Sequence, residues 1–424
     1  MPVYPGWGSP GGELTLGLYC LSPFLGTRKD GFFDRFFEGR ELACVPGENI
    51  LLKVTSELLE KTSRLTEMMF REGLGGVLLN AQHNFAWLTG GGSNGIDASR
   101  ENGASFLLVR ADGRVFNLAN NIEMPRLVAE EIPAGVFEPV EFAWEAEKAS
   151  PDLVVEKAKT LIGSGELASD IPVHGGTRAV EGLIAPCRYS LTAGEIERYK
   201  ALGADSGEAL GGMAERIAPG DTEIEVRRKA HDEMAARGIA PVVLLVAADE
   251  RIAEFRHPVP TGKRWEKVLL IACCAKRGGL ITSQSRIYCA GEIPGELQRQ
   301  TEANAFVFAR MLAATRPGAN AADLYRTTEE AYRSEGFPGE IHKHHQGGAC
   351  GYRTRDWVAH PASGETVKPN QAFAWNPTIT GTKVEETAIV AESGMEIITA
   401  SPGWPAIPAV IDGKEFLSPG ILSL

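Results

Sequence analysis

The chain has 424 residues, of which 43% are hydrophobic and 23% are charged, an ordinary composition for a globular protein. Its formal net charge of −12 argues against nucleic acid as a partner, because nucleic-acid binding favours basic surfaces. A chain of this length exceeds one ordinary hydrophobic core, so we expect two domains.

Cysteine usage and hydropathy indicate the compartment. The seven cysteines are scattered along the chain and odd in number, so they do not indicate a disulfide framework. The apolar run 14–25 is too short and broken to span a bilayer, and no basic segment precedes it as in a signal peptide. We therefore expect a cytoplasmic protein with no membrane partner.

Residues 1–50 are rich in Gly, Pro and aromatic residues, and we assign no element to them. From there to residue 190, helical and strand-like patterns alternate, which indicates a small α/β domain. Its expected elements are a helix over 56–73, a strand over 76–80, a hairpin of 105–110 with 115–118 around Asp112-Gly113, and helices over 122–131 and 151–162. We place the boundary near residue 190, so that the two domains comprise residues 1–190 and 191–424.

The second domain contains an approximate internal repeat. Its first helix opens with a capping box from Thr192 to Glu195, and a second capping box follows from Thr222 to Glu225. A Pro-Gly pair and a later glycine both recur after 98 positions; these landmarks are Pro219-Gly220 with Pro317-Gly318, and Gly238 with Gly336. This offset predicts two helix–helix–strand units packed as equivalent halves, with a cleft between them.

The stretch from His342 to Glu385 concentrates residues suited to a functional site. Three of the eight histidines lie within residues 342–345, and aromatic and basic residues and then a strand-like segment follow. Imidazoles can move protons or bind metals near neutral pH, and guanidinium groups bind carboxylates. A hydrated loop with satisfied histidines is the alternative for any single residue here, but the cluster as a whole indicates a site.

These features resemble the prolidase, aminopeptidase P and creatinase family over about residues 55–400. The motifs that carry the resemblance are Glu195-Ile196-Glu197, His257-Pro258, the hairpin 268–286, His345-Gln346-Gly347-Gly348, Asn376-Pro377 and Lys383-Val384-Glu385. The resemblance implies an α/β N-terminal domain and an internally duplicated α+β C-terminal domain with the pita-bread fold. It also implies a homodimer in which the small domain of one chain borders the cleft of the other.

In the metallopeptidases of this family, two aspartates, one histidine and two glutamates hold a pair of divalent metals. The positions that match those five ligands in this sequence are Ala272, Ser283, His345, Asn376 and Glu385. No Asp or Glu occurs from Val268 through Gly291, so no shift of alignment restores a carboxylate there. Because zinc normally takes at least three protein ligands, we expect no metal site and no cofactor.

Creatinase-like members of the family work without metal, and the resemblance then implies roles for individual residues. His257 would be the general acid/base, and His345 and Glu385 would orient the substrate. Asn376 stands where a glutamate would hold a guanidinium group, so the substrate should be less cationic than creatine. The residues expected to bind substrate are Arg286, Arg353, Asn376 and Tyr352.

The expected function is that of a metal-independent hydrolase or lyase that acts at a C–N bond of a small polar molecule or short peptide. Two alternatives stay open: a catalytically inactive pseudo-peptidase that binds a small molecule or a partner, and a metal-dependent Xaa-Pro aminopeptidase. A cysteine nucleophile is disfavoured, because Cys273 and Cys274 are neighbours on a strand and at most one of them can face the cleft.

Overall fold

The computed structural model describes residues 48–424, with side chains from Ser56 onward. Most of the unassigned stretch 1–50 therefore lies outside the described residues. Residues 49–424 form one compact unit, so the domain boundary near residue 190 stays a prediction. In this part of the chain, no helix is both long enough and apolar enough to cross a membrane.

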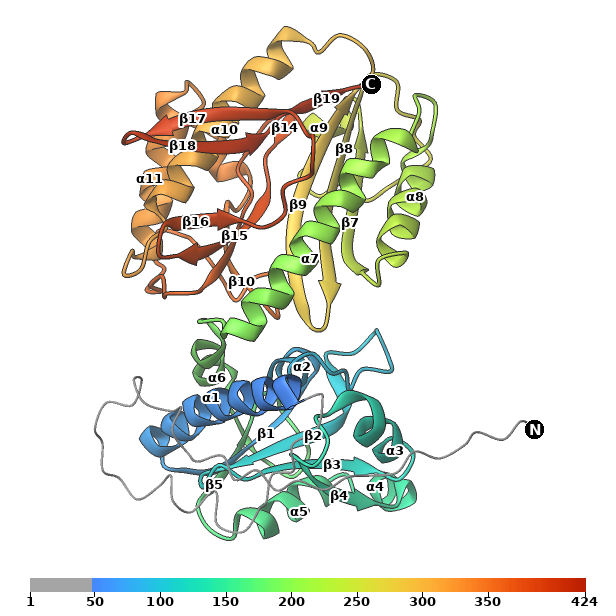
Figure 1. The fold of residues 1–424 in the computed structure, drawn as a ribbon, viewed down its shortest axis with the longest axis vertical. Helices are drawn as coiled ribbons and strands as arrows, with labels where there is room; N and C mark the ends of the chain where they lie inside the picture. Colours follow the sequence, from blue (N-terminus) through green and yellow to red (C-terminus); the bar gives the residue numbers. More distant parts are fainter. Residues whose placement is uncertain (1–47) are drawn as a thin grey trace, which may run out of the picture. The chain divides into compact units, whose positions relative to one another are not determined.

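Six strands form one mixed sheet in the order β4-β3-β2-β1-β5-β6 (Figure 1). The strands are β1 (Leu74–Ala81), β2 (Asn102–Arg110), β3 (Val115–Asn120), β4 (Glu138–Phe142), β5 (Glu166–Ser169) and β6 (Arg178–Ala179). The helices of this part are α1 (Glu48–Glu72), α2 (Gln82–Thr89), α3 (Met124–Arg126), α4 (Trp144–Ala149), α5 (Leu153–Ile162) and α6 (Glu181–Arg188).

Alternate residues of β1 pack on the two faces of this sheet. Val77 and Leu79 belong to the same apolar cluster as Met68 of α1, whereas Leu78 belongs to a second cluster with Val154 of α5. Successive side chains of a strand point to opposite faces, so α1 and α5 cover opposite sides of the sheet. The α/β organisation expected for this part of the chain is confirmed.

The remaining strands form a four-stranded sheet in the order β19-β9-β8-β7, a five-stranded sheet in the order β11-β10-β12-β15-β16, and two two-stranded hairpins. The first sheet contains β7 (Ala240–Ala248), β8 (Val268–Arg277), β9 (Leu280–Cys289) and β19 (Ile421–Ser423). The second contains β10 (Gly347–Cys350), β11 (Trp357–Val358), β12 (Ala372–Trp375), β15 (Glu386–Ala391) and β16 (Gly394–Ile397). The hairpins are β13 (Thr378–Ile379) with β14 (Thr382–Lys383), and β17 (Ala406–Ile411) with β18 (Lys414–Pro419).

Each of these two sheets packs against its own helices (Figure 1). The helices are α7 (Ala193–Gly212), α8 (Glu223–Ala235), the short α9 (Arg251–Glu254), α10 (Gly295–Ala314) and α11 (Ala321–Ser334). The apolar sides of α7 and α8 share a cluster with β7 and β8, and those of α10 and α11 share one with β12 and β15. Both predicted capping boxes are present as reciprocal hydrogen bonds at the starts of α7 and α8.

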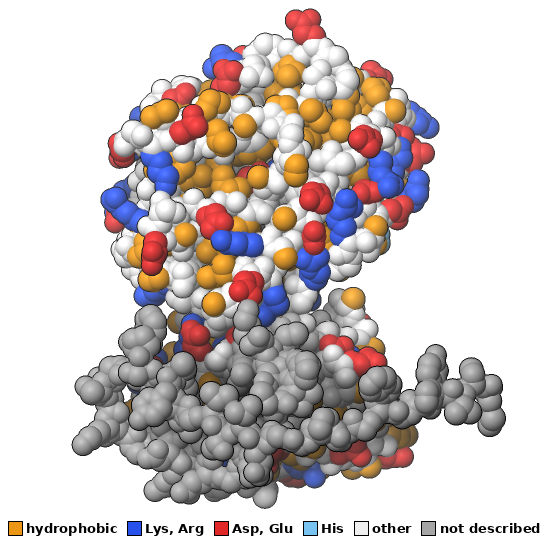
Figure 2. Space-filling view, viewed as in Figure 1, with side chains coloured by type: hydrophobic (Ala, Val, Ile, Leu, Met, Phe, Trp, Pro, Cys, Tyr) orange, Lys and Arg blue, Asp and Glu red, His pale blue; other side chains and the backbone are white. Residues whose placement is uncertain are grey.

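The charge of the surface is mixed in sign where Figure 2 shows it. Over the elements from α7 to β19, Lys and Arg side chains are interspersed with Asp and Glu, and apolar side chains lie between them. A nucleic-acid-binding face would instead gather basic side chains. The face that Figure 2 shows has no such gathering of basic side chains over these elements.

The 98-residue offset reappears in the backbone. Gly220 and Gly318 both have positive φ, 98° and 86°, and each donates its N–H to a carbonyl across a loop, Trp265 O at 2.8 Å and Val367 O at 2.9 Å. Gly238 also has positive φ, as its counterpart does. These matches support an internal duplication, which stays a prediction; superposing residues 195–290 on 293–400 should bring both glycine pairs together.

Matched glycine variants test whether the two positions are equivalent. We expect Gly220→Ala and Gly318→Ala each to lower the free energy of unfolding by about 1–2 kcal/mol, the typical cost of left-handed backbone for a residue with a Cβ. An added Cβ meets nothing within 4 Å at either position, so the cost is conformational rather than steric. Urea unfolding measures it, with Gly182→Ala in α6 as the control at an open position. A cost confined to one of the two variants would contradict equivalence.

Candidate functional site

Three histidines from two distant segments meet in one cluster. His257 follows α9, and His344 and His345 follow a 3₁₀ turn over Glu340–Lys343. One nitrogen from each ring can be chosen so that all three lie within 4.8 Å of one another, and His257 Nε2 lies 3.1 Å from His344 Nε2. We call these three residues the imidazole cluster. The sequence predicted His257 and His345 as site residues, and the structure brings them together.

The imidazoles of the cluster are neutral at neutral pH. Partial burial, together with Lys383 and the neighbouring rings, lowers the pKa of His344 to about 2. Partial desolvation and Arg355 lower the pKa of His345 to about 4, although its side chain is partly exposed. Partial desolvation and Lys383 also lower the pKa of His257, which is likewise partly exposed. A neutral imidazole keeps one nitrogen free to accept a proton or to bind a metal ion.

Beside the cluster lies Glu385, a buried carboxylate held by two cations. Its Oε1 lies 3.2 Å from Arg355 Nη2, and its Oε2 lies 2.9 Å from Lys383 Nζ. Burial alone would raise the pKa of Glu385, but the two cations lower it below the ordinary value. The charge of Glu385 acts to raise the pKa of both His257 and His345, against the larger lowering by burial and by the nearby cations.

The β8–β9 hairpin completes this group of residues. Arg355 Nη1 donates to Ser283 Oγ at 3.2 Å, and Ser283 Oγ lies 3.3 Å from Cys274 Sγ. We call Glu385, Lys383, Arg355, Ser283 and Cys274 the Glu385 group. Burial raises the pKa of Cys274, which keeps its thiol protonated and makes it a poor nucleophile.

The donors at the five positions matched to metal ligands do not fit a dinuclear centre. Ala272 and Ser283 lie on one face of the β8–β9 hairpin, because Cys274 pairs with Ser283 two residues along the strand from Ala272. Asn376 is buried and donates its N–H to the carbonyl of Gln346, the residue after His345. A pair of hard divalent ions needs several anionic oxygens. These positions supply one carboxylate, and two cations already neutralise it.

The structure places the other predicted substrate-binding residues elsewhere. Arg286 is buried on the opposite face of β9 from Ser283, and its Nη1 lies 2.8 Å from a carboxylate oxygen of Glu386. The Tyr352 hydroxyl donates to Glu195 Oε1 at 2.8 Å. Arg353 is about half exposed. None of these three contacts the imidazole cluster or the Glu385 group through a hydrogen bond or ion pair recorded for the described residues.

The structure adds residues that the sequence-based site did not include. His344 takes part in the imidazole cluster, and Lys383 and Arg355 bind Glu385. Lys383 could have been predicted as a site residue from the sequence, because it lies two positions before Glu385 and residues two apart in an extended segment share a face. His344 could have been predicted because it is next to His345. No feature of the nearby sequence distinguishes Arg355, which binds Glu385, from Arg353, which does not.

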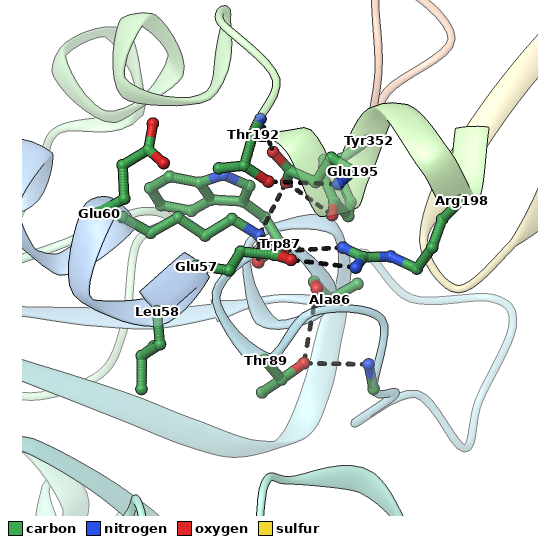
Figure 3. A network of polar contacts seen from close by, with 12 residues as sticks. Glu57, Leu58, Glu60, Ala86, Trp87, Thr89, Thr192, Glu195, Arg198 and Tyr352 are labelled. Carbon is green, nitrogen blue, oxygen red and sulfur yellow. Dashed lines mark hydrogen bonds and ion pairs between the residues drawn. The ribbon is translucent and has the colours of Figure 1, made fainter. Parts of the chain in front are cut away.

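A second buried network surrounds Lys61 of α1. Figure 3 shows its members Glu57, Glu195 and Arg198 turned toward one another at the start of α7. Lys61 Nζ lies 2.5 Å from Glu57 Oε1 and 2.7 Å from Glu195 Oε1, and donates to the Trp87 carbonyl at 2.6 Å. Arg198 binds Glu57 from α7. The network joins α1 to the first turn of α7 and, through Tyr352, to the loop that carries Arg355.

Residues 197–398 match the model of metallopeptidase family M24. No curated protein sequence matches the chain. Among solved structures, Xaa-Pro dipeptidase from Bacillus anthracis is 20% identical, with a TM-score of 0.68 over 81% of this chain and 98% of that chain. Prolidase from Pyrococcus furiosus is 18% identical, with a TM-score of 0.66 over 79% of this chain and 99% of that chain.

A third similar structure comes from a different kind of protein. The N-terminal domain of the FACT complex subunit SPT16 from Cicer arietinum (chickpea) is 10% identical, with a TM-score of 0.62 over 81% of this chain and 96% of that chain. At these identities the likenesses show the fold alone. They agree with the fold that the sequence motifs implied.

Proposed function

We propose that the chain is an enzyme that hydrolyses a C–N bond without a dinuclear metal centre, because residues 197–398 match the model of metallopeptidase family M24 and the fold is similar to that of prolidases and Xaa-Pro dipeptidases. The observation that carries the proposal is the imidazole cluster beside the Glu385 group. In the Glu385 group, Arg355 and Lys383 supply the positive charge that neutralises the remaining carboxylate. The proposed substrate is a short peptide or a small amide.

His257 is the proposed general acid/base. Its imidazole is exposed and neutral, and its Nε2 lies 3.1 Å from that of His344, which positions the ring. In the proposed reaction, His257 accepts a proton from the water that attacks the carbonyl carbon. The C–N bond then breaks, and His257 returns the proton to the leaving nitrogen. His345 and Glu385 orient the substrate, as the family resemblance implies.

Two polar atoms near this site support a bound polar substrate. Asn376 Oδ1 and Arg355 Nε are buried and have no hydrogen-bond partner in the described part of the chain. Buried polar groups without a partner are costly, so ligand or water commonly satisfies them. An N–H group of the substrate would satisfy Asn376 Oδ1, and an oxygen would satisfy Arg355 Nε.

A second candidate function is binding without catalysis. The likeness to the N-terminal domain of a subunit of the FACT complex favours it, because that domain comes from a protein named as part of an assembly. The two candidates differ in what a bound peptide or amide becomes. An enzyme would cleave the bound peptide or amide, whereas a binding protein would release it unchanged.

A substrate screen on chelator-treated protein tests the proposal. We expect turnover of at least one compound among Xaa-Pro peptides, small amides and ureas, followed by detection of the released amine. Glu385→Gln should reduce that turnover, because it leaves Arg355 and Lys383 without their carboxylate, whereas His360→Gln, outside both groups, should not. Binding of a compound without release of amine would favour the second candidate. Turnover that appears only with added divalent metal would favour a metal-dependent peptidase.

We also propose that the chain forms a homodimer. C2 pairing is the commonest oligomeric arrangement, and the family resemblance implies it here. Sedimentation at micromolar concentration should give twice the chain mass of 45.6 kDa. A mass equal to that of one chain would contradict the proposal.

A further inference from the structure

We infer that the imidazole cluster is a binding site for one divalent transition-metal ion of the zinc class. The site differs from the family's dinuclear centre, since two of its three ligands, His257 and His344, are not among the five matched positions. It also differs from the sequence-based expectation of no metal. The binding itself does not rest on the proposed function.

The spacing of the ring nitrogens suits a single small ion. Zinc–nitrogen bonds of about 2.0–2.1 Å place two imidazole ligands roughly 3.3 Å apart in a tetrahedral site. His257 Nε2 and His344 Nε2 are already 3.1 Å apart, and the candidate atoms of all three rings lie within 4.8 Å. His345 is exposed, so a small rotation of its side chain can bring it to bonding distance.

Other contacts leave these nitrogens available. The hydrogen bonds recorded for the described residues give His257 Nε2 one partner, the Nε2 of His344. His344 Nδ1 is buried without any partner. The rings therefore face one another rather than a carboxylate that would explain their position. Glu385 is engaged by Arg355 and Lys383, which leaves the imidazoles as the donors for an ion.

The donor type selects the class of metal. Imidazole nitrogen suits zinc, copper and nickel, whereas magnesium and calcium prefer oxygen ligands. Three histidines leave a fourth position for water or a substrate atom, as in known three-histidine zinc sites. The cluster should therefore bind Zn²⁺ in preference to Mg²⁺.

One consequence does rest on the proposed function. A metal ion on His257 Nε2 occupies the atom that would carry the proton, so zinc should inhibit the proposed hydrolysis. The imidazole cluster would then serve either as proton carrier or as metal site, but not as both at once.

Calorimetric titration of the full, chelator-treated chain with Zn²⁺ tests the inference. We expect one ion per chain, and no comparable binding of Mg²⁺. His257→Gln and His344→Gln should each weaken Zn²⁺ binding by about 100-fold or more. Loss of a residue that only hydrogen-bonds to a metal ligand already costs about 10–100-fold in affinity, and these residues are the ligands themselves. The matched control is His342→Gln, whose exposed ring lies outside the cluster and should leave binding unchanged.

Two results would overturn the inference. One is the absence of zinc binding by protein that circular dichroism shows to be folded. The other is zinc binding that stays unchanged in both His257→Gln and His344→Gln. Zinc that binds at the cluster without lowering turnover would support the metal site and count against His257 as the proton carrier, so the two proposals can fail separately.

Discussion

Replacement of His257 by alanine is expected to lower turnover by about 10²–10⁴-fold, the typical contribution of a positioned general acid or base. His257 presents an exposed, neutral imidazole within 3.1 Å of His344 and close to the charge of Glu385. Its loss removes the proton carrier but no part of the apolar core. Turnover of the substrate found by screening, measured with chelator present throughout, gives the size of the effect.

Two variants serve as comparisons for this result. His345→Ala should act more on KM than on kcat, because the proposed role of His345 is to orient the substrate. His342→Ala should leave both constants unchanged, since its side chain is exposed and outside the cluster. Unchanged kcat in His257→Ala would show that His257 only ends a loop before Pro258.

Replacement of Lys61 by methionine is expected to lower the free energy of unfolding by about 3–5 kcal/mol, as when one partner of a buried ion pair is removed. Lys61 is fully buried, and its Nζ lies 2.7 Å from Glu195 Oε1 and 2.5 Å from Glu57 Oε1. Glu57 keeps Arg198, but Glu195 is left as a buried carboxylate without its cation (Figure 3). Urea unfolding measures the change.

Matched variants separate this effect from a general loss of charge. Lys200→Met removes a partly exposed lysine paired with Glu396, and should cost less than about 1 kcal/mol. Adding Glu195→Gln to Lys61→Met should restore part of the loss, because the unpaired buried charge is then gone. A cost for Lys61→Met no larger than that for Lys200→Met would contradict a structural role for the network.

The fold was largely predictable because its signals are local. A short apolar run predicted β1, the Asp112-Gly113 turn predicted the hairpin of β2 with β3, and the Thr-to-Glu spacing predicted both capping boxes. Each of these depends only on residues near one another in sequence. The start of α1 at Glu48, eight positions before the predicted helix, lay in a stretch without a clear pattern.

The site was less predictable because it depends on packing between distant segments. His257 and His345 could be found from the family motifs, but their contact with His344 needs the loop after α9 to meet the turn before β10. The sequence around an arginine does not show which carboxylate the arginine binds in the folded chain. Arg355 reaches Glu385, whereas Arg286 is held by Glu386 inside the core.

The most direct test of the account combines metal analysis with turnover on the same preparation. Protein treated with chelator should carry at most a trace of divalent metal by elemental analysis and should still turn over the substrate found by screening. Before treatment, it should hold no more than one ion per chain, at the imidazole cluster. Two ions per chain, whose removal abolishes turnover and whose return restores it, would contradict the central claim.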